Sequence, residues 1–267
     1  MSVQSFLASS FDYFERPGVS DVQTIIDDFA DRALHHNSPV WTDQGGGAYK
    51  SLVDAFGRFF DVMFTRVTQQ KLEMRLRDQN GVTICTRRIN CPSANTWMTR
   101  IYTGQYHLWI EAQVFTAAAE YLYAGILDLS PDAQNAHAQY VYGNGSRTTA
   151  DSADQFRANN QSFMLDNNAP GTAQRNTLYQ QKASTSVAIV ATMNGSRIFR
   201  PVEQWVQPAG VPNVFSWAGR RYQTLIVDSA WTAGTLFQVP IDVGLSAWFK
   251  VVETYTSYAA TFAIRVA

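Results

Sequence analysis

The sequence has few charged residues, and their signs nearly cancel. Charged residues make up 16% of its 267 positions, against about 25% in typical soluble proteins. The 21 basic and 22 acidic residues give a formal net charge of −1, and no basic cluster stands out. This balance argues against a nucleic-acid partner, because nucleic-acid-binding surfaces are strongly basic. We therefore expect a surface that is largely neutral or covered by partner proteins.

Long apolar runs are also missing. No run approaches the roughly 18 residues that a membrane-spanning helix needs, and residues 1–18 lack the basic start and continuous apolar stretch of a secretory signal. We predict neither a membrane partner nor a secretory route.

Cysteine is scarce, with Cys85 and Cys91 alone in the chain. Six positions of extended chain would separate their Cα atoms by about 20 Å, at roughly 3.3 Å per residue, which is too far for a disulfide. Both are predicted to be buried thiols, typical of a protein that assembles in a reducing cytoplasm.

Motifs for catalysis or metal binding are not found either. The four histidines are not accompanied by HExxH or paired CxxC patterns, so we predict no metal site, no cofactor and no enzyme activity. His35 and His36 are interpreted as the end of a helix. The run GGGAYKS contains Lys50-Ser51 after glycines, but Tyr49 replaces the glycine before the lysine, so a phosphate-binding loop is not expected. Residues 38–57 are predicted to be a loop.

One helix is predicted, over residues 20–34. Ser20 and Gln23 fit a capping box, and Asp21 lies at the positive end of the helix dipole. The helix is amphipathic because its apolar residues recur at helical spacing on one stripe: Val22, Ile25, Ile26, Phe29, Ala30, Ala33 and Leu34.

The clearest strands lie within residues 58–89. Leu72, Met74 and Leu76 alternate with charged residues, which predicts a half-buried strand before a turn at residues 78–81. A two-residue loop would pair Leu76 with Cys85. We predict instead a three-residue loop with Gly81 left-handed, which pairs Leu76 with Ile84 and Glu73 with Arg87.

The remaining strands indicate a mainly β fold. We predict an antiparallel β-sandwich or barrel-like core with one N-terminal amphipathic helix. The residues form an N-terminal arm (1–18) and a β-rich domain (19–267), and a division into two subdomains within residues 131–183 is left open. The other predicted strands cover 97–103, 105–115, 116–129, 186–192, 196–200, 221–228, 235–239 and 247–266. The alanines of 116–129 also favour a helix, but its apolar run is assigned to a strand.

Aromatic residues near the N-terminus are the candidate contacts to other subunits. Those of the arm follow no sustained period, so they either pack on their own domain or dock on a neighbouring subunit. The predicted interface candidates are Phe6, Phe11, Tyr13, Phe14, Trp41 and Tyr49.

Several segments of the first 150 residues resemble virion structural proteins of tailed bacteriophages. They are GRFFD at 57–61, LEMRLRD at 72–78 with Asn80-Gly81, and the stretches 101–105, 124–131 and 142–147. The resemblance implies a non-enzymatic subunit of a neck or collar, tail, baseplate or capsid surface. It would be a homo-oligomer that contacts other virion proteins and assembles in the host cytoplasm. The alternative is a receptor-binding tail module that binds or cleaves carbohydrate, with tryptophans as a platform and two carboxylates from among Glu111, Glu120, Asp128, Asp151 and Asp154.

Overall fold

The computed structural model describes the chain in segments. They are residues 11–36, 40–53, 59, 61–77, 81–91, 96–113, 119–126, 140–146, 163–165, 176–180, 192–193, 196–197, 199–207, 216–228, 234–242, 245–251 and 260–267. Within them the chain forms strands β1 to β19 and one helix, α2. Every strand pair is antiparallel. The predicted mainly β fold with one helix is confirmed.

The largest sheet has 12 strands, of which β1 and β17 are the two ends. In spatial order they are β1 (Phe11–Val19), β7 (Trp97–Gly104), β8 (His107–Gln113), β9 (Ala119–Ile126), β10 (Tyr140–Ser146), β11 (Phe163–Leu165), β12 (Asn176–Gln180), β15 (Phe199–Gln207), β16 (Ser216–Asp228), β19 (Ala260–Arg265), β18 (Leu245–Val251) and β17 (Leu236–Asp242).

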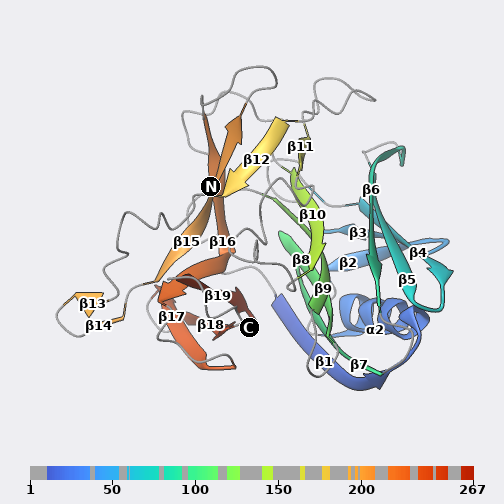
Figure 1. Ribbon diagram of the computed structural model, residues 1–267, viewed down its shortest axis with the longest axis horizontal. Helices are drawn as coiled ribbons and strands as arrows, with labels where there is room; N and C mark the ends of the chain where they lie inside the picture. The colour runs from blue at the N-terminus through green and yellow to red at the C-terminus, as the bar shows by residue number, and fades with distance from the viewer. Residues whose placement is uncertain are drawn as a thin grey trace.

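A second sheet has five strands in sequence order, and a third is a two-stranded hairpin. The five are β2 (Trp41–Gly45), β3 (Ala48–Ser51), β4 (Asp61–Thr68), β5 (Lys71–Arg77) and β6 (Thr83–Asn90); the hairpin is β13 (Thr192–Met193) with β14 (Ser196–Arg197). Figure 1 shows the five-stranded sheet and α2 beside β1 and β7–β10, with β15–β19 on the opposite side. The 12-stranded sheet therefore contributes two of three layers.

Helix α2 spans Val22–His35 and is capped by Asp21, whose carboxylate accepts a hydrogen bond of 2.8 Å from the Gln23 backbone nitrogen. The predicted capping box at Ser20 was one residue early, because the carboxylate of Asp21 reaches the free amide itself. His36 is the C-cap. The predicted apolar stripe is confirmed, since its residues are buried or pack partly buried against the core.

The helix meets the five-stranded sheet through an aromatic cluster. The fully buried ring of Phe29 lies 5.4 Å from Trp41, 5.1 Å from Tyr49 and 4.9 Å from Phe64, measured between centroids. Edge and tilted contacts of this kind add to the stabilisation that burial provides. Trp41 and Tyr49 are thus core residues between the helix and the sheet.

The predicted loop at 38–57 is wrong, because it contains the hairpin β2–β3. Gly45, Gly46 and Gly47 all have positive φ, at 81°, 63° and 79°, which only glycine adopts readily. Gly47 also approaches β4 closely: its carbonyl accepts a 2.9 Å hydrogen bond from the Phe64 nitrogen. The glycine run builds a hairpin turn rather than a phosphate cradle.

The predicted register of the β5–β6 hairpin is also wrong. Gly81 is left-handed as expected, with φ 78°, but Leu76 pairs with Cys85 rather than with Ile84. The observed register sets fully buried Ile89 opposite fully buried Leu72 and sets Arg88 opposite Glu73. The predicted one would have placed Arg88 opposite Leu72 on the buried face.

Most other predicted strands are present with shifted ends. The segment at 116–129, whose alanines also suit a helix, contains strand β9, and residues 131–183 contain the short strands β10, β11 and β12. At the junction of the strands predicted at 186–192 and 196–200, β13 and β14 form an antiparallel pair, with Thr192 opposite Arg197 and Met193 opposite Ser196. Cys91 is a buried free thiol, as predicted, and burial raises its pKa to about 12. The side chain of Cys85 lies outside the described residues.

Gly46 and Gly47 of the β2–β3 turn provide a matched test of the close approach of Gly47 to β4. We expect Gly46→Ala to destabilise the protein by about 1–2 kcal/mol, the cost of a left-handed alanine. At Gly47 a Cβ would also lie 2.7 Å from the Phe64 carbonyl oxygen, whereas nothing lies within 4 Å at Gly46. Gly47→Ala should therefore cost roughly 1–3 kcal/mol more. Urea denaturation measures both, and equal losses would contradict the packing described here.

Candidate functional site

The strand pairing of β1, β7 and β8 builds three rows of side chains across one face of the 12-stranded sheet. Residues directly opposite in antiparallel strands project on the same face. The register therefore aligns Glu15–Arg100–Glu111, then Tyr13–Tyr102–Trp109, then Phe11–Gly104–His107. The opposite face of β7 and β8 carries the apolar core residues Trp97, Ile101, Leu108, Ile110 and Ala112.

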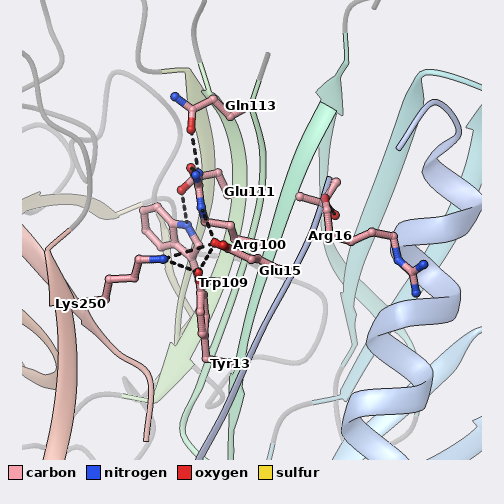
Figure 2. A network of polar contacts seen from close by, with 9 residues as sticks. Tyr13, Glu15, Arg16, Arg100, Trp109, Glu111, Gln113 and Lys250 are labelled. Atoms are coloured by element: carbon pink, nitrogen blue, oxygen red, sulfur yellow. Dashed lines mark hydrogen bonds and ion pairs between the residues drawn. The ribbon is translucent and has the colours of Figure 1, made fainter. Parts of the chain in front are cut away.

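The first row alternates acid, base and acid. The Arg100 guanidinium lies 3.2 Å from Glu15 and 2.7 Å from Glu111, and it donates a 2.7 Å hydrogen bond to Gln113. The carboxylate of Glu111 has no exposed surface and also accepts a hydrogen bond of 3.4 Å from the Trp109 indole nitrogen. Figure 2 shows Arg100 between the two carboxylates.

A lysine from the opposite layer completes the network. Lys250 of β18 donates a 2.6 Å hydrogen bond to the Tyr13 hydroxyl and lies 3.3 Å from the Glu15 carboxylate. Tyr13 in turn donates to Glu15. In Figure 2, Lys250 reaches Tyr13 and Glu15 from the side opposite to the helix. Since β1 and β18 lie near opposite ends of the sheet order, the 12-stranded sheet curls until its ends meet here.

The contacts of this network shift the pKa values of Tyr13, Glu15 and Arg100 away from neutral pH. Burial and the hydrogen bond to Glu15 raise the pKa of Tyr13 well above its ordinary value. Burial alone would raise the pKa of Glu15, but the Tyr13 hydrogen bond and the Lys250 charge outweigh it and lower that pKa. Burial would lower the pKa of Arg100, yet the Glu111 charge raises it. A general acid or base needs a pKa near the working pH, so this arrangement is suited to holding layers together.

The third row brings another buried cation to the seam, by which we mean the place where β1 meets β18 and β19. The rings of Phe11 and His107 are stacked with centroids 5.9 Å apart, and the Arg265 guanidinium of β19 lies 5.3 Å from the Phe11 ring centre. Arg265 is 5% exposed, and burial lowers its pKa to about 10. It therefore remains charged at neutral pH, over the negative face of an aromatic ring.

The other face of β1 is tied to the helix by ion pairs. Asp12 binds Arg32 through two contacts of 2.6 Å, and Arg16 binds buried Asp28 at 2.7 and 2.6 Å. The ring of Phe14 lies between the two arginines, 5.5 Å from Arg16 and 5.1 Å from Arg32. Strand β1 is therefore held from both sides, by α2 and by β18–β19.

The structure places the predicted interface residues as follows. Phe11, Trp41 and Tyr49 are buried in their own chain, and Tyr13 and Phe14 are partly buried. Phe6 lies outside the described residues. Residues 11–18 of the predicted arm form most of β1 and pack on their own sheet. A truncation that probes contacts between subunits therefore has to stop before Phe11.

Sequence reasoning missed the charge row itself. Arg100 lies between Thr99 and Ile101, Glu111 between Ile110 and Ala112, and Lys250 between Phe249 and Val251. Neighbours along a strand project to opposite faces, so this pattern is the ordinary alternation of a half-exposed strand, and only the strand pairing reveals that these charges are buried together. Glu111 is also removed from the carbohydrate alternative, since its carboxylate is buried against Arg100. Trp41, Trp97 and Trp109 are each 1% exposed and so form no open platform.

Two comparisons with known proteins, one with family models and one with curated sequences, assign no family to the chain. Neither a protein-family model nor a curated protein sequence matches this chain. Among the residues that the structure describes, no group of three or more His, Cys, Asp or Glu side chains is arranged to hold a metal ion. Over the same residues, no helix has the length and apolar character to cross a membrane.

The lowered pKa of Glu15 predicts how stability depends on acid. Its charged form contributes stability that is present above its ordinary pKa of 4.5 and is lost as the pH falls through its lower folded pKa. We expect Glu15→Gln to reduce the free energy of unfolding at pH 7. Below pH 4.5 the free energy of unfolding of this variant should fall less steeply with decreasing pH than that of the wild type. Urea denaturation from pH 7 to pH 3 measures both. Parallel pH profiles of Glu15→Gln and the wild type would contradict the assignment.

Proposed function

We propose that this protein is a non-enzymatic structural subunit of a tailed-bacteriophage virion, a component of a neck, collar or tail ring that assembles with copies of itself and with other virion proteins. The virion assignment rests on the sequence resemblance. The assembly role is supported by how the fold uses its charges.

The observation that carries the proposal is that charged side chains pair inside the chain, between its layers. Glu15, Arg100, Glu111 and Lys250 join the two ends of the long sheet, and other pairs join β1 to α2 or strand to strand in the five-stranded sheet: Asp12–Arg32, Arg16–Asp28, Asp61–Arg77 and Glu73–Arg88. Charge is already scarce in the sequence, and these pairs leave fewer uncompensated charges among the residues that the structure describes. The centres of large permanent interfaces are depleted in charge in the same way.

Strands β17 and β18 present the apolar contact that we assign to a second copy of this chain. Leu236 is 56% exposed and Trp248 is 39% exposed. The register pairs Leu236 with Lys250 and Gln238 with Trp248, so the two apolar side chains share one face with these two polar ones. Pro240 on β17 has no amide hydrogen to donate, which disfavours the addition of a further strand at the edge. We therefore assign the contact to the face of the hairpin and not to its edge.

The assembly role is tested by light scattering of the purified full chain over a range of concentrations. We expect a defined oligomer, and we expect Leu236→Lys with Trp248→Lys to shift it at least tenfold in concentration towards monomer, since burying two lysines opposes association. Val67, 43% exposed on β4 of the other sheet, is the matched control, and Val67→Lys should leave the mass unchanged.

Two outcomes would overturn parts of this proposal. If the protein stays a monomer at all concentrations, both alone and when mixed with virion particles that lack it, the assembly role is removed. Mass spectrometry of gradient-purified particles from the phage that encodes the chain tests the virion assignment. Recovery of the chain only from the unassembled fraction would contradict it.

A further inference from the structure

The β17–β18 hairpin and strand β1 meet at the seam, but they are held to the rest of the protein very differently. Strand β1 pairs with β7 at seven positions between Phe11 and Val19 and is also bound to α2 by the Asp12–Arg32 and Arg16–Asp28 ion pairs. The hairpin pairs with β19 at three positions, Phe249 to Val251, and through the backbone of Trp248 with residues 266–267. Any opening of the seam should therefore move the hairpin and leave β1 in place.

The hairpin is coherent enough to move as a unit. Its two strands pair with each other at six positions, between Leu236 and Asp242 on β17 and Leu245 and Lys250 on β18. Phe237 and Phe249 are also stacked with ring centroids 5.8 Å apart. On its outer side, β17 pairs with no further strand within the part of the chain that the structure describes. Elements with one short ladder and an exposed flank are the ones that open locally in native proteins.

The contact that holds the hairpin at β1 is a side-chain contact. Lys250 donates to Tyr13 and pairs with Glu15, and its ammonium lies 4.8 Å from the centre of the Tyr13 ring. The apolar side of the same strand contributes the fully buried Phe249 and the buried Val251 to the core. The apolar side therefore favours closure in general, and Lys250 fixes the position in which the hairpin closes.

We propose that the β17–β18 hairpin is a strap that opens and closes over β1, and that Lys250 is the residue that holds it closed. Opening separates Lys250 from Tyr13 and Glu15 and uncovers these two side chains while α2, β1 and the five-stranded sheet stay folded. The strap is a conformational device of the monomer, and it does not depend on membership of a virion.

Hydrogen exchange of the full chain, read by mass spectrometry at a concentration at which light scattering gives a monomer, tests the strap, because a second copy bound to the hairpin would slow exchange there. In the wild type, amides of β17 and β18 should exchange faster than those of α2 and β5. Lys250→Met should raise the exchange rates of β17 and β18 by about tenfold, the loss expected for one charge-assisted contact, and leave β1 unchanged. Lys250→Arg should restore slow exchange. Arg66→Met, which breaks the Arg66–Asp21 pair at the other end of the molecule, should leave the strap at wild-type rates.

A cross-link in the wild-type protein provides the converse measurement and does not depend on a variant folding. A carbodiimide joins a carboxylate to an amine without a spacer, and the Glu15 and Lys250 groups are 3.3 Å apart. The cross-linked chain should exchange at β17 and β18 at least tenfold more slowly. The proposal is overturned if these strands exchange as slowly as α2 before cross-linking, or if β1 accelerates together with them in Lys250→Met.

Discussion

The buried carboxylate of Glu111 is the constraint on which the middle layer depends. A charge without exposed surface is tolerated only beside a compensating charge and hydrogen-bond donors. The strand register supplies both, because it places Arg100 directly opposite Glu111 and places Glu15 on the other side of Arg100. A shift of β7 by one residue would turn Arg100 to the apolar face and bring Ile101 or Thr99 beside the carboxylate. The ion pair thus fixes the register of the strands that carry it.

Strand β1 connects the row Glu15–Arg100–Glu111 to the neighbouring layers. One of its faces carries Tyr13 and Glu15 towards β18, and the other carries Asp12 and Arg16 towards α2. Alternation along a single strand therefore joins the helix to β18. The contact is made by Lys250 with Tyr13, which lies 237 positions earlier in the sequence (Figure 2). Bringing such distant residues together costs loop-closure entropy, which the contacts at the seam have to offset. The seam is accordingly the place where we expect the structure to open most readily.

The parts that the sequence predicts well are those with local causes. The stripe of α2 follows from helical spacing, and the alternation from Leu72 to Leu76 follows from the pleat. The glycine run was misinterpreted because three consecutive glycines suit both a loop and a tight turn, and only the carbonyl of Phe64, which belongs to another strand, decides between them. The β5–β6 register was misassigned because Ile84 was given more weight than the more distant Ile89. The charge row could not be derived at all, since it depends on which strands become neighbours.

A double-mutant cycle on Arg100 and Glu111 is the most direct test of the central claim that this row braces the fold. Arg100→Met should lose about 3–5 kcal/mol of unfolding free energy, as expected when one partner of a buried pair is removed. Glu111→Gln should restore part of that loss when it is combined with Arg100→Met, because it removes the buried charge. The predicted result is therefore a double variant that is more stable than Arg100→Met alone. Strictly additive losses, or a loss below about 1 kcal/mol as for an exposed pair, would contradict the account.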